Sequence, residues 1–242
     1  MAIASAGRPQ KPPTTPAAGT ALCECLVVWL DDNPRSGPLN MAIDEALLEV
    51  SPVPVLRVYR WDGPWVSIGY FTRREDAVRA FPDRPIVRRW TGGGIVDHAY
   101  DWTYSLAIPS GQPLAALGTE ASYQVIHAAL ADALTACGCP AALTPAPAAG
   151  SNGLCFQSPV RADVVSDGRK VAGAAQRRTR RGLLHQGSVQ GIEYPSGLAW
   201  ALAARLHTSP TLDTPPQADF LVARARKLAE SRYADPAWSA RK

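Results

Sequence analysis

The sequence has no apolar run long enough to span a membrane: runs such as Leu26–Leu30 are far short of the roughly 18 residues required. It has five cysteines in 242 residues, an odd and low number that argues against a disulfide framework. No secretory signal pattern opens the chain. The net charge of +4 is small and no nucleic-acid-reading motif is present. We therefore expect a cytoplasmic protein with free thiols and with neither a membrane nor a nucleic-acid partner.

The composition that remains is that of a packed globular chain, because hydrophobic residues make up 46% and charged residues 19%. Residues 1–20 contain four prolines and no acidic residue, so they bury too little apolar area to offset their ordering entropy. We expect a disordered lead over 1–20, a catalytic domain over 21–233 and a loose tail over 234–242.

Hydrophobic periodicity predicts strands and helices that alternate along the central part of the chain. The dipeptide Asp167-Gly168 predicts a tight hairpin turn. Together these patterns predict one α+β domain of mixed sheets packed with helices. The predicted strands are 25–30, 55–59, 65–68, 86–89, 102–108, 163–166, 169–176 and 183–190, and the predicted helices are 39–50, 119–136, 197–207 and 219–230.

A first motif that could have a chemical function places two adjacent arginines close to three successive glycines. Arg88 and Arg89 supply charge-assisted donors for a carboxylate or phosphate. Gly92, Gly93 and Gly94 allow a ligand to approach the backbone amides closely. The motif matches neither common nucleotide-binding fingerprint. The alternative is a glycine turn between strands with solvated arginines.

A second motif follows the predicted hairpin turn, where Lys170 begins the returning strand. The next positions carry almost no side chain, and a strand interior so poor in bulk is unusual unless a ligand or another backbone fills the space. An extended acyl chain would explain the composition; the alternative is an exposed hairpin with a surface lysine. The small residues concerned are Gly173, Ala174 and Ala175.

Cys155 lies in a loop just before this hairpin. A lone cysteine is more often a small core residue than a nucleophile. A neighbouring ammonium such as that of Lys170 would lower the thiol pKa from its free value of ~8.5 and favour the thiolate. Neither the remaining cysteines nor the histidines have the spacing of zinc ligands, so we expect no metal site.

Four arginines cluster after the hairpin, at Arg177, Arg178, Arg180 and Arg181. Such a run is usually a solvated face. The functional alternative is a docking patch for an acidic protein domain, because opposite charges steer association.

In their order along the chain, these motifs resemble the biotin/lipoate A/B protein ligase family over about residues 25–210. The resemblance implies a class II aminoacyl-synthetase-like architecture, as in biotin and lipoate ligases. The segments that carry it are Asn40–Glu45, Leu56–Trp61, Val66–Phe71, Arg88–Gly94, Thr103–Ser105 and Gly168–Gln176.

Within the family, Cys155-Phe156-Gln157-Ser158-Pro159 ahead of Gly-Arg-Lys-Val-Ala-Gly is similar to the LipM-type octanoyltransferases, in which that cysteine carries the acyl group. Three positions depart from the family pattern and bear on the acyl pocket. Thr72 stands where glutamine is usual, and Ala99 replaces the aspartate that usually follows His98. Asp97 stands at an apolar position and is a candidate to replace that carboxylate, although adjacent residues on a strand point to opposite faces.

The resemblance implies transfer of an octanoyl group from acyl carrier protein to a lysine of a lipoyl domain, in 2-oxoacid dehydrogenases or the glycine cleavage H protein. Cys155 would form the acyl-enzyme and Lys170 would activate it, with no cofactor. The alternatives are an ATP- and Mg²⁺-dependent lipoate–protein ligase and a non-catalytic protein that binds acyl-carrier or lipoyl domains. The implied acyl-binding residues are Arg88, Arg89, Gly92, Gly93, Gly94, His98, Gly173, Ala174 and Ala175.

Overall fold

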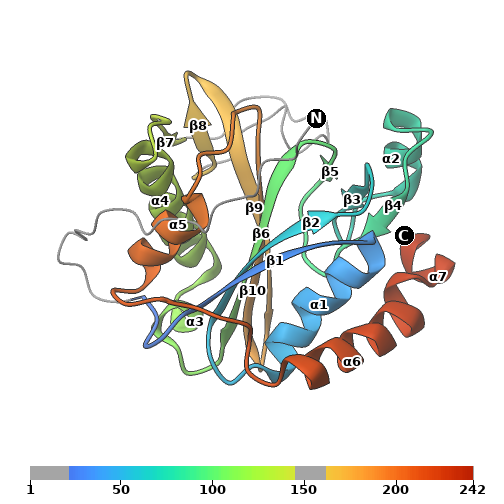
Figure 1. Cartoon of the computed structure of the whole chain (residues 1–242). Coiled ribbons are helices and arrows are strands. Elements are labelled where there is room, and N and C mark those ends of the chain that lie inside the picture. Colours follow the sequence, from blue (N-terminus) through green and yellow to red (C-terminus); the bar gives the residue numbers. More distant parts are fainter. Residues whose placement is uncertain (1–21, 145–161, 242) are drawn as a thin grey trace, which may run out of the picture.

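Eight strands form a mixed sheet through the middle of the molecule in a computed structural model that describes residues 22–144 and 162–241 (Figure 1). β1 pairs in parallel with β2 and with β11, and every other neighbouring pair is antiparallel. The sheet order is β11-β1-β2-β6-β10-β9-β8-β7. The strands are β1 (Val27–Arg35), β2 (Val55–Trp61), β6 (Asp101–Pro109), β7 (Ala142–Leu143), β8 (Val164–Ser166), β9 (Arg169–Thr179), β10 (Gly182–Gln190) and β11 (Thr211–Leu212).

The chain segment between β2 and β6, two strands that pair with each other, forms a second, three-stranded sheet. β3 is its central strand, parallel to β4 and antiparallel to β5, and α2 (Arg74–Ala80) packs beside it. β6 begins beside the end of β2, so the small sheet stays next to these two interior strands. Its strands are β3 (Val66–Ile68), β4 (Ile86–Arg88) and β5 (Ile95–Asp97).

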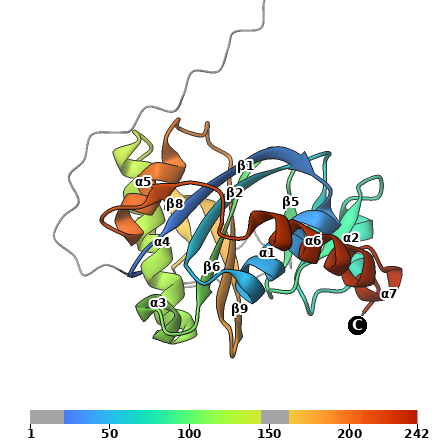
Figure 2. The same cartoon turned by 60° about the horizontal axis from the view of Figure 1, so that its bottom comes forward.

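Helices cover both faces of the main sheet (Figures 1 and 2). One hydrophobic cluster joins α4 (Thr119–Ala136) and α5 (Leu198–Leu206) to one face. A second cluster joins α1 (Gly37–Val50) and α6 (Ala218–Leu228) to the other. The short α3 (Pro113–Ala116) precedes α4, and a π-helical turn, η1 (Ala229–Tyr233), leads from α6 into α7 (Pro236–Ser239). In the described part of the chain, no helix has the length and apolarity needed to cross a bilayer.

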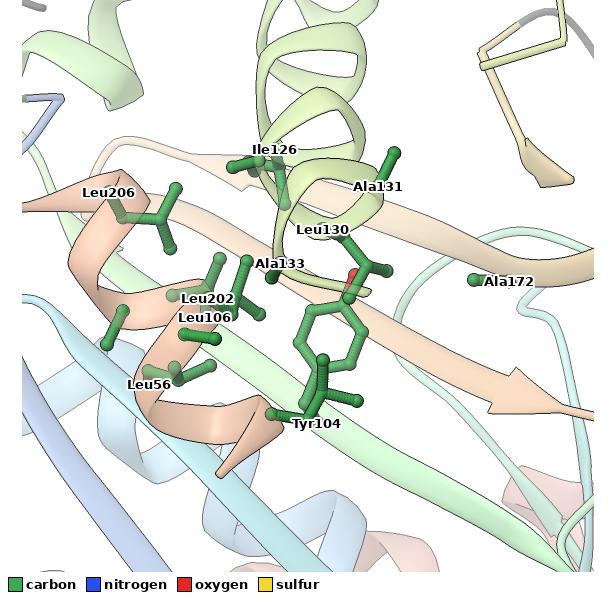
Figure 3. Close-up of a cluster of buried hydrophobic side chains, with 14 of the residues drawn as sticks. Leu56, Tyr104, Leu106, Ile126, Leu130, Ala131, Ala133, Ala172, Leu202 and Leu206 are labelled. Carbon is green, nitrogen blue, oxygen red and sulfur yellow. The ribbon is translucent and has the colours of Figure 1, made fainter. Parts of the chain in front are cut away.

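The larger cluster shows how the sheet is packed under α4 and α5 (Figure 3). Leu130 of α4, Leu202 of α5 and Leu106 of β6 are all fully buried there. The ring of Tyr104 lies over Gly187, where a Cβ would come within 2.3 Å of the ring. Glycine at this position therefore allows the close packing.

Side chains of β1, β2 and α1 form a buried ionic network between the main sheet and α1. Arg57 is fully buried and pairs with Asp31 at 2.7 Å and with Asp44 at 2.8 Å. Asn40 Oδ1 accepts a further bond from Arg57 Nη2 at 2.7 Å. A buried charge is tolerated only when it is paired and hydrogen-bonded, so these residues hold the fold.

The predicted α+β domain of mixed sheets and helices is confirmed. The predicted hairpin is also confirmed: Asp167 and Gly168 have φ of 48° and 73° and connect β8 to β9. The predicted loose tail is wrong for residues 234–241, because α7 forms there and Trp238 is buried in the second cluster. The predicted disordered lead over 1–20 lies outside the described residues.

Candidate functional site

A narrow cavity lies between the main sheet and the small sheet. β9 and β10 supply one wall, and the small sheet with the residues that follow its strands supplies the opposite one. Most of the lining is apolar, and its polar side chains come from both sheets. A mostly apolar space with a few polar groups suits a slender apolar chain that carries a polar group. The lining residues are Met41, Tyr59, Trp61, Ser67, Arg89, Val96, His98, Thr103, Gly173, Ala174, Ala175, Gln186, Gly187 and Ser188.

The small residues of β9 lie at this cavity. Gly173, Ala174 and Ala175 all line it, and their partners across β10 include Gly187, which pairs with Ala174. Side chains of the protein itself take part of the room that the small residues leave: the Tyr104 ring lies over Gly187 and Lys170 lies over Gly173. The three small residues of β9 thus line the cavity as the sequence pattern suggests, while the binding of an acyl chain there stays a prediction.

Lys170 lies across Gly173, at the edge of the same wall. A Cβ on Gly173 would come within 2.8 Å of Lys170 Cε. The Lys170 side chain is only 3% exposed, and its ammonium lies 2.7 Å from a carboxylate oxygen of the fully buried Asp163. Cys155 lies outside the described residues, so its distance from Lys170 stays a prediction. Sequence analysis missed Asp163, although a carboxylate directly before β8, in the hairpin that carries the lysine, was a usable signal.

His98 is held by hydrogen bonds at both ring nitrogens. Nδ1 lies 2.7 Å from Asp101 Oδ2, and Nε2 lies 2.6 Å from Ser67 Oγ. The ring stacks on Trp61 at 4.1 Å between centroids. Because a carboxylate can only accept, Nδ1 carries a proton toward Asp101. In the neutral imidazole, Nε2 then accepts from the Ser67 hydroxyl.

Asp101 supplies the carboxylate that the sequence lacks at Ala99. It follows His98 by three residues across the turn from β5 to β6, so its side chain returns to the imidazole. Thr103 and Ser188 also donate to Asp101 Oδ2, at 2.7 and 2.6 Å. Asp97 turns away, as strand alternation predicts, and pairs with Arg84.

Arg89 lines the cavity and also contacts the glycine loop, Gly92–Gly94. Its Nη1 donates to Ser67 Oγ at 2.6 Å, and its Nη2 donates to the carbonyls of Gly92 and Gly94, both at 3.0 Å. The guanidinium is nearly buried, at 6% exposure. Arg89 thus joins the Ser67–His98–Asp101 chain to the loop and presents positive charge beside the cavity.

Arg88 does not line the cavity. Its fully buried guanidinium donates to six backbone carbonyls, those of Gly69, Tyr70, Thr72, Trp238, Ser239 and Arg241. Burial, followed by the nearby charge of Arg241, lowers the pKa of Arg88 from its usual value. Alternation along β4 turns the two arginines to opposite sides, so the structure gives Arg88 a role in holding α7 against the small sheet.

The glycine loop packs on the turn that follows β3. A Cβ on Gly69 would come within 1.8 Å of the Gly93 carbonyl oxygen, and Thr72 Oγ1 donates to that same oxygen at 2.9 Å. Gly93 has φ of 82°, in the left-handed region that favours glycine. Gly92, Gly93 and Gly94 are absent from the cavity lining, and their contact with an acyl carbonyl stays a prediction.

The four arginines after the hairpin do not form one patch. Arg177 lies over the rings of Tyr70 and Trp90, at 5.3 and 5.0 Å. Arg178 turns to the other face of the sheet, where it donates to the Ala115 carbonyl at 2.9 Å and to Ser122 Oγ at 2.7 Å. Strand alternation causes this separation. Arg180 and Arg181 are exposed, and Arg181 also donates to the Glu49 carbonyl at 3.0 Å.

Cys23, Cys25, Cys137 and Cys139 are free thiols. Burial raises the pKa of Cys23 to about 12, so this thiol stays protonated at neutral pH. Over residues 22–144 and 162–241, no group of three or more His, Cys, Asp or Glu side chains is placed to hold a metal ion.

The fold is that of lipoate ligases of known structure. The protein Ta0514 of T. acidophilum, determined with bound lipoic acid, superposes with a TM-score of 0.72 at 19% identity, covering 89% of this chain and 98% of that one. Lipoate-protein ligase A bound with ATP superposes with a TM-score of 0.67, also at 19% identity, covering 89% and 98%. At this identity the likeness shows the fold alone.

Sequence relatives extend the comparison. Octanoyltransferase LipM of Oceanobacillus iheyensis is 32% identical over 66% of this chain and 62% of its own length. Octanoyltransferase LipM of Symbiobacterium thermophilum is 38% identical over 66% and 63%. The chain thus spans a little over three fifths of these relatives. The model of the lipoyl protein ligase A/B catalytic domain matches residues 36–190, which include the whole cavity lining. The chain belongs to the lipoyl protein ligase A/B catalytic domain family.

Proposed function

We propose that the protein is an acyltransferase that moves an octanoyl group from acyl carrier protein to a lysine of a lipoyl domain. The observation that carries this proposal is its identity of 32–38% with proteins described as octanoyltransferases LipM. The cavity supports it, because a mostly apolar lining beside a buried ammonium suits an acyl chain with a reactive carbonyl at one end.

The acyl group would travel on Cys155. The Cys155 thiolate attacks the thioester carbonyl of the octanoyl carrier, the carrier thiolate leaves, and a thioester acyl-enzyme forms. The amine of the acceptor lysine then attacks this carbonyl, so an amide forms, Cys155 leaves as thiolate, and the amine loses its proton. A covalent nucleophile divides the transfer into two easier steps.

Lys170 would serve both steps through its positive charge. An ammonium near a thiol lowers the thiol pKa and so raises the fraction of thiolate. The same charge stabilises the oxyanion that develops on the carbonyl in each tetrahedral intermediate. The buried pair with Asp163 supports this role, because it holds the ammonium in one place beside the cavity wall.

The proposed partners are octanoyl-acyl carrier protein as donor and a lipoyl domain of a 2-oxoacid dehydrogenase or glycine cleavage H protein as acceptor. The donor thioester is already activated, so the reaction requires no ATP. An ATP-dependent lipoate–protein ligase shares the fold and is the competing function. In that reaction Cys155 has no chemical part.

Intact-mass measurement after mixing the protein with octanoyl-acyl carrier protein, without ATP, tests the proposal. We expect the wild type to gain one octanoyl group that passes to an added lipoyl domain, and Cys155→Ala to gain none. Cys137→Ala is the matched control, because it removes a half-buried cysteine away from the cavity. Acylation of the lipoyl domain only with lipoate and ATP, and at full rate in Cys155→Ala, would instead identify a ligase.

A further inference from the structure

We propose that Tyr123 is a positioning residue for Lys170, acting through Asp163. The inference rests on the proposed function, in which the Lys170 ammonium assists the reacting thiol and carbonyl. Lysine has a flexible four-carbon stem and a compact charge, so its place is set by what the ammonium contacts. Here that contact includes Asp163 Oδ2 at 2.7 Å, with both side chains buried.

The second oxygen of Asp163 is held by Tyr123. The Tyr123 hydroxyl donates to Asp163 Oδ1 at 2.6 Å. The same hydroxyl accepts the backbone N–H of Ala174 at 3.2 Å, and Ala174 lines the cavity. One hydroxyl on α4 therefore joins the carboxylate that orients Lys170 to the wall on which the acyl chain would lie. With both oxygens engaged, the carboxylate plane is fixed.

The protonation of Tyr123 suits this role. Burial and then the charge of Asp163 raise the pKa of Tyr123 above its usual value. The hydroxyl thus keeps its proton at working pH and remains a donor. A phenolate at this place would repel the carboxylate instead.

The backbone of Asp163 is anchored by the same helix. His127 lies one turn after Tyr123 on α4, and its Nδ1 donates to the Ala162 carbonyl at 2.7 Å. Ala162 has φ of 66°, a left-handed conformation that costs energy in a residue other than glycine. Two side chains of one helix face thus fix two successive residues, so the position of Lys170 is set by α4 as well as by its own strand.

Tyr123→Phe removes the hydroxyl and keeps the ring. Octanoyl transfer would be measured at saturating and limiting octanoyl carrier, with the kcat of the variant expected to fall about ten- to a hundredfold and its KM to stay within about twofold. This is the size expected for losing one hydrogen bond to a charged group. The matched control is Tyr233→Phe, since Tyr233 also donates to a buried carboxylate, that of Glu45, away from the cavity. We expect its kcat to equal that of the wild type.

A second readout does not depend on turnover. The side-chain NMR signals of Lys170, identified by their absence in Lys170→Arg, would be compared in wild type and Tyr123→Phe. We expect the variant to change their chemical shifts, because the carboxylate that holds the ammonium is no longer fixed. If no variant transfers octanoyl groups but the Lys170 signals still respond, the proposed function fails and the positioning role stands.

The double variant completes the test. Asp163→Asn would lower kcat at least as much as Tyr123→Phe, and the combination would cost no more than Asp163→Asn alone, because Tyr123 acts through that carboxylate. Multiplicative losses would overturn the proposal. An unchanged kcat and unchanged Lys170 signals in folded Tyr123→Phe would also overturn it.

Discussion

Acidification should destabilise this protein through His127, and the size of the effect follows from its surroundings. His127 is fully buried against Tyr123 and the Ala162 carbonyl. Burial lowers its pKa from 6.5 to about 4, so the folded state holds it neutral. The unfolded chain protonates this imidazole from about pH 6.5 downward. Between these values the unfolded state binds more protons, so stability falls as the pH falls.

The magnitude follows from the two pKa values. Between about pH 7.5 and about pH 5, the difference in proton binding integrates to ~2 kcal/mol of lost stability from His127 alone. Continued acidification toward the folded pKa raises the loss to ~3 kcal/mol. His185 adds to the effect in the same direction, because burial lowers its pKa well below 6.5 too.

Urea denaturation at a series of pH values would measure this in wild type and in His127→Asn. The asparagine amide retains a donor for the Ala162 carbonyl but does not titrate in this range. Titration of the carboxylates is common to both proteins, whereas the charge of His127 also lowers the pKa of His185, so the variant reduces that contribution in the same direction. We expect the wild type to lose ~2 kcal/mol more than the variant between about pH 7.5 and pH 5. Equal losses in both proteins would refute the reasoning.

Three further outcomes follow from the site. Arg88→Met should lower the free energy of unfolding by about 3 kcal/mol or more, because six backbone carbonyls lose a fully buried charged donor. A raised KM at unchanged stability would point to ligand binding instead. Gly69→Ala should lower the Tm measured by calorimetry, because the added methyl group overlaps the Gly93 carbonyl at a cost of about 1–3 kcal/mol. Gly63→Ala is the control and should leave the Tm unchanged, because a Cβ there meets nothing within 4 Å. Nitrogen-15 shifts should find His98 protonated at Nδ1, with Asp101→Asn weakening that preference; an Nε2–H tautomer in the wild type contradicts the network.

Local patterns predicted most of the elements. The apolar stripe of residues 39–50 fixes α1 to within two residues of its start, because burial of one face decides a helix. The helix predicted over 119–136 matches α4 in both bounds. By contrast, α2 escaped prediction because it is short and polar and buries only Ala77.

The site was less accessible from sequence, because its side chains are defined by partners far along the chain. Arg88 and Arg89 look equivalent in the sequence. Yet Arg89 lines the cavity, whereas Arg88 donates hydrogen bonds to backbone carbonyls about 150 residues further along the chain. Strand alternation could have separated their roles, but not named their partners. Asp101 was within reach, since a carboxylate three residues after His98 can return across a tight turn. Tyr123 carried no such signal.

The contacts of Arg88 impose an order on how the protein is built. Translation proceeds at roughly 5–20 residues per second, so residues 238–241 follow Arg88 by on the order of ten seconds. During that interval three of the six carbonyls that satisfy its guanidinium do not yet exist. The small sheet, which supplies one wall of the cavity, therefore reaches its final packing late, although its strands are synthesised early. In a nascent chain the main-sheet wall of the cavity would form before the opposite wall, and the cavity would be complete only after α7 has emerged.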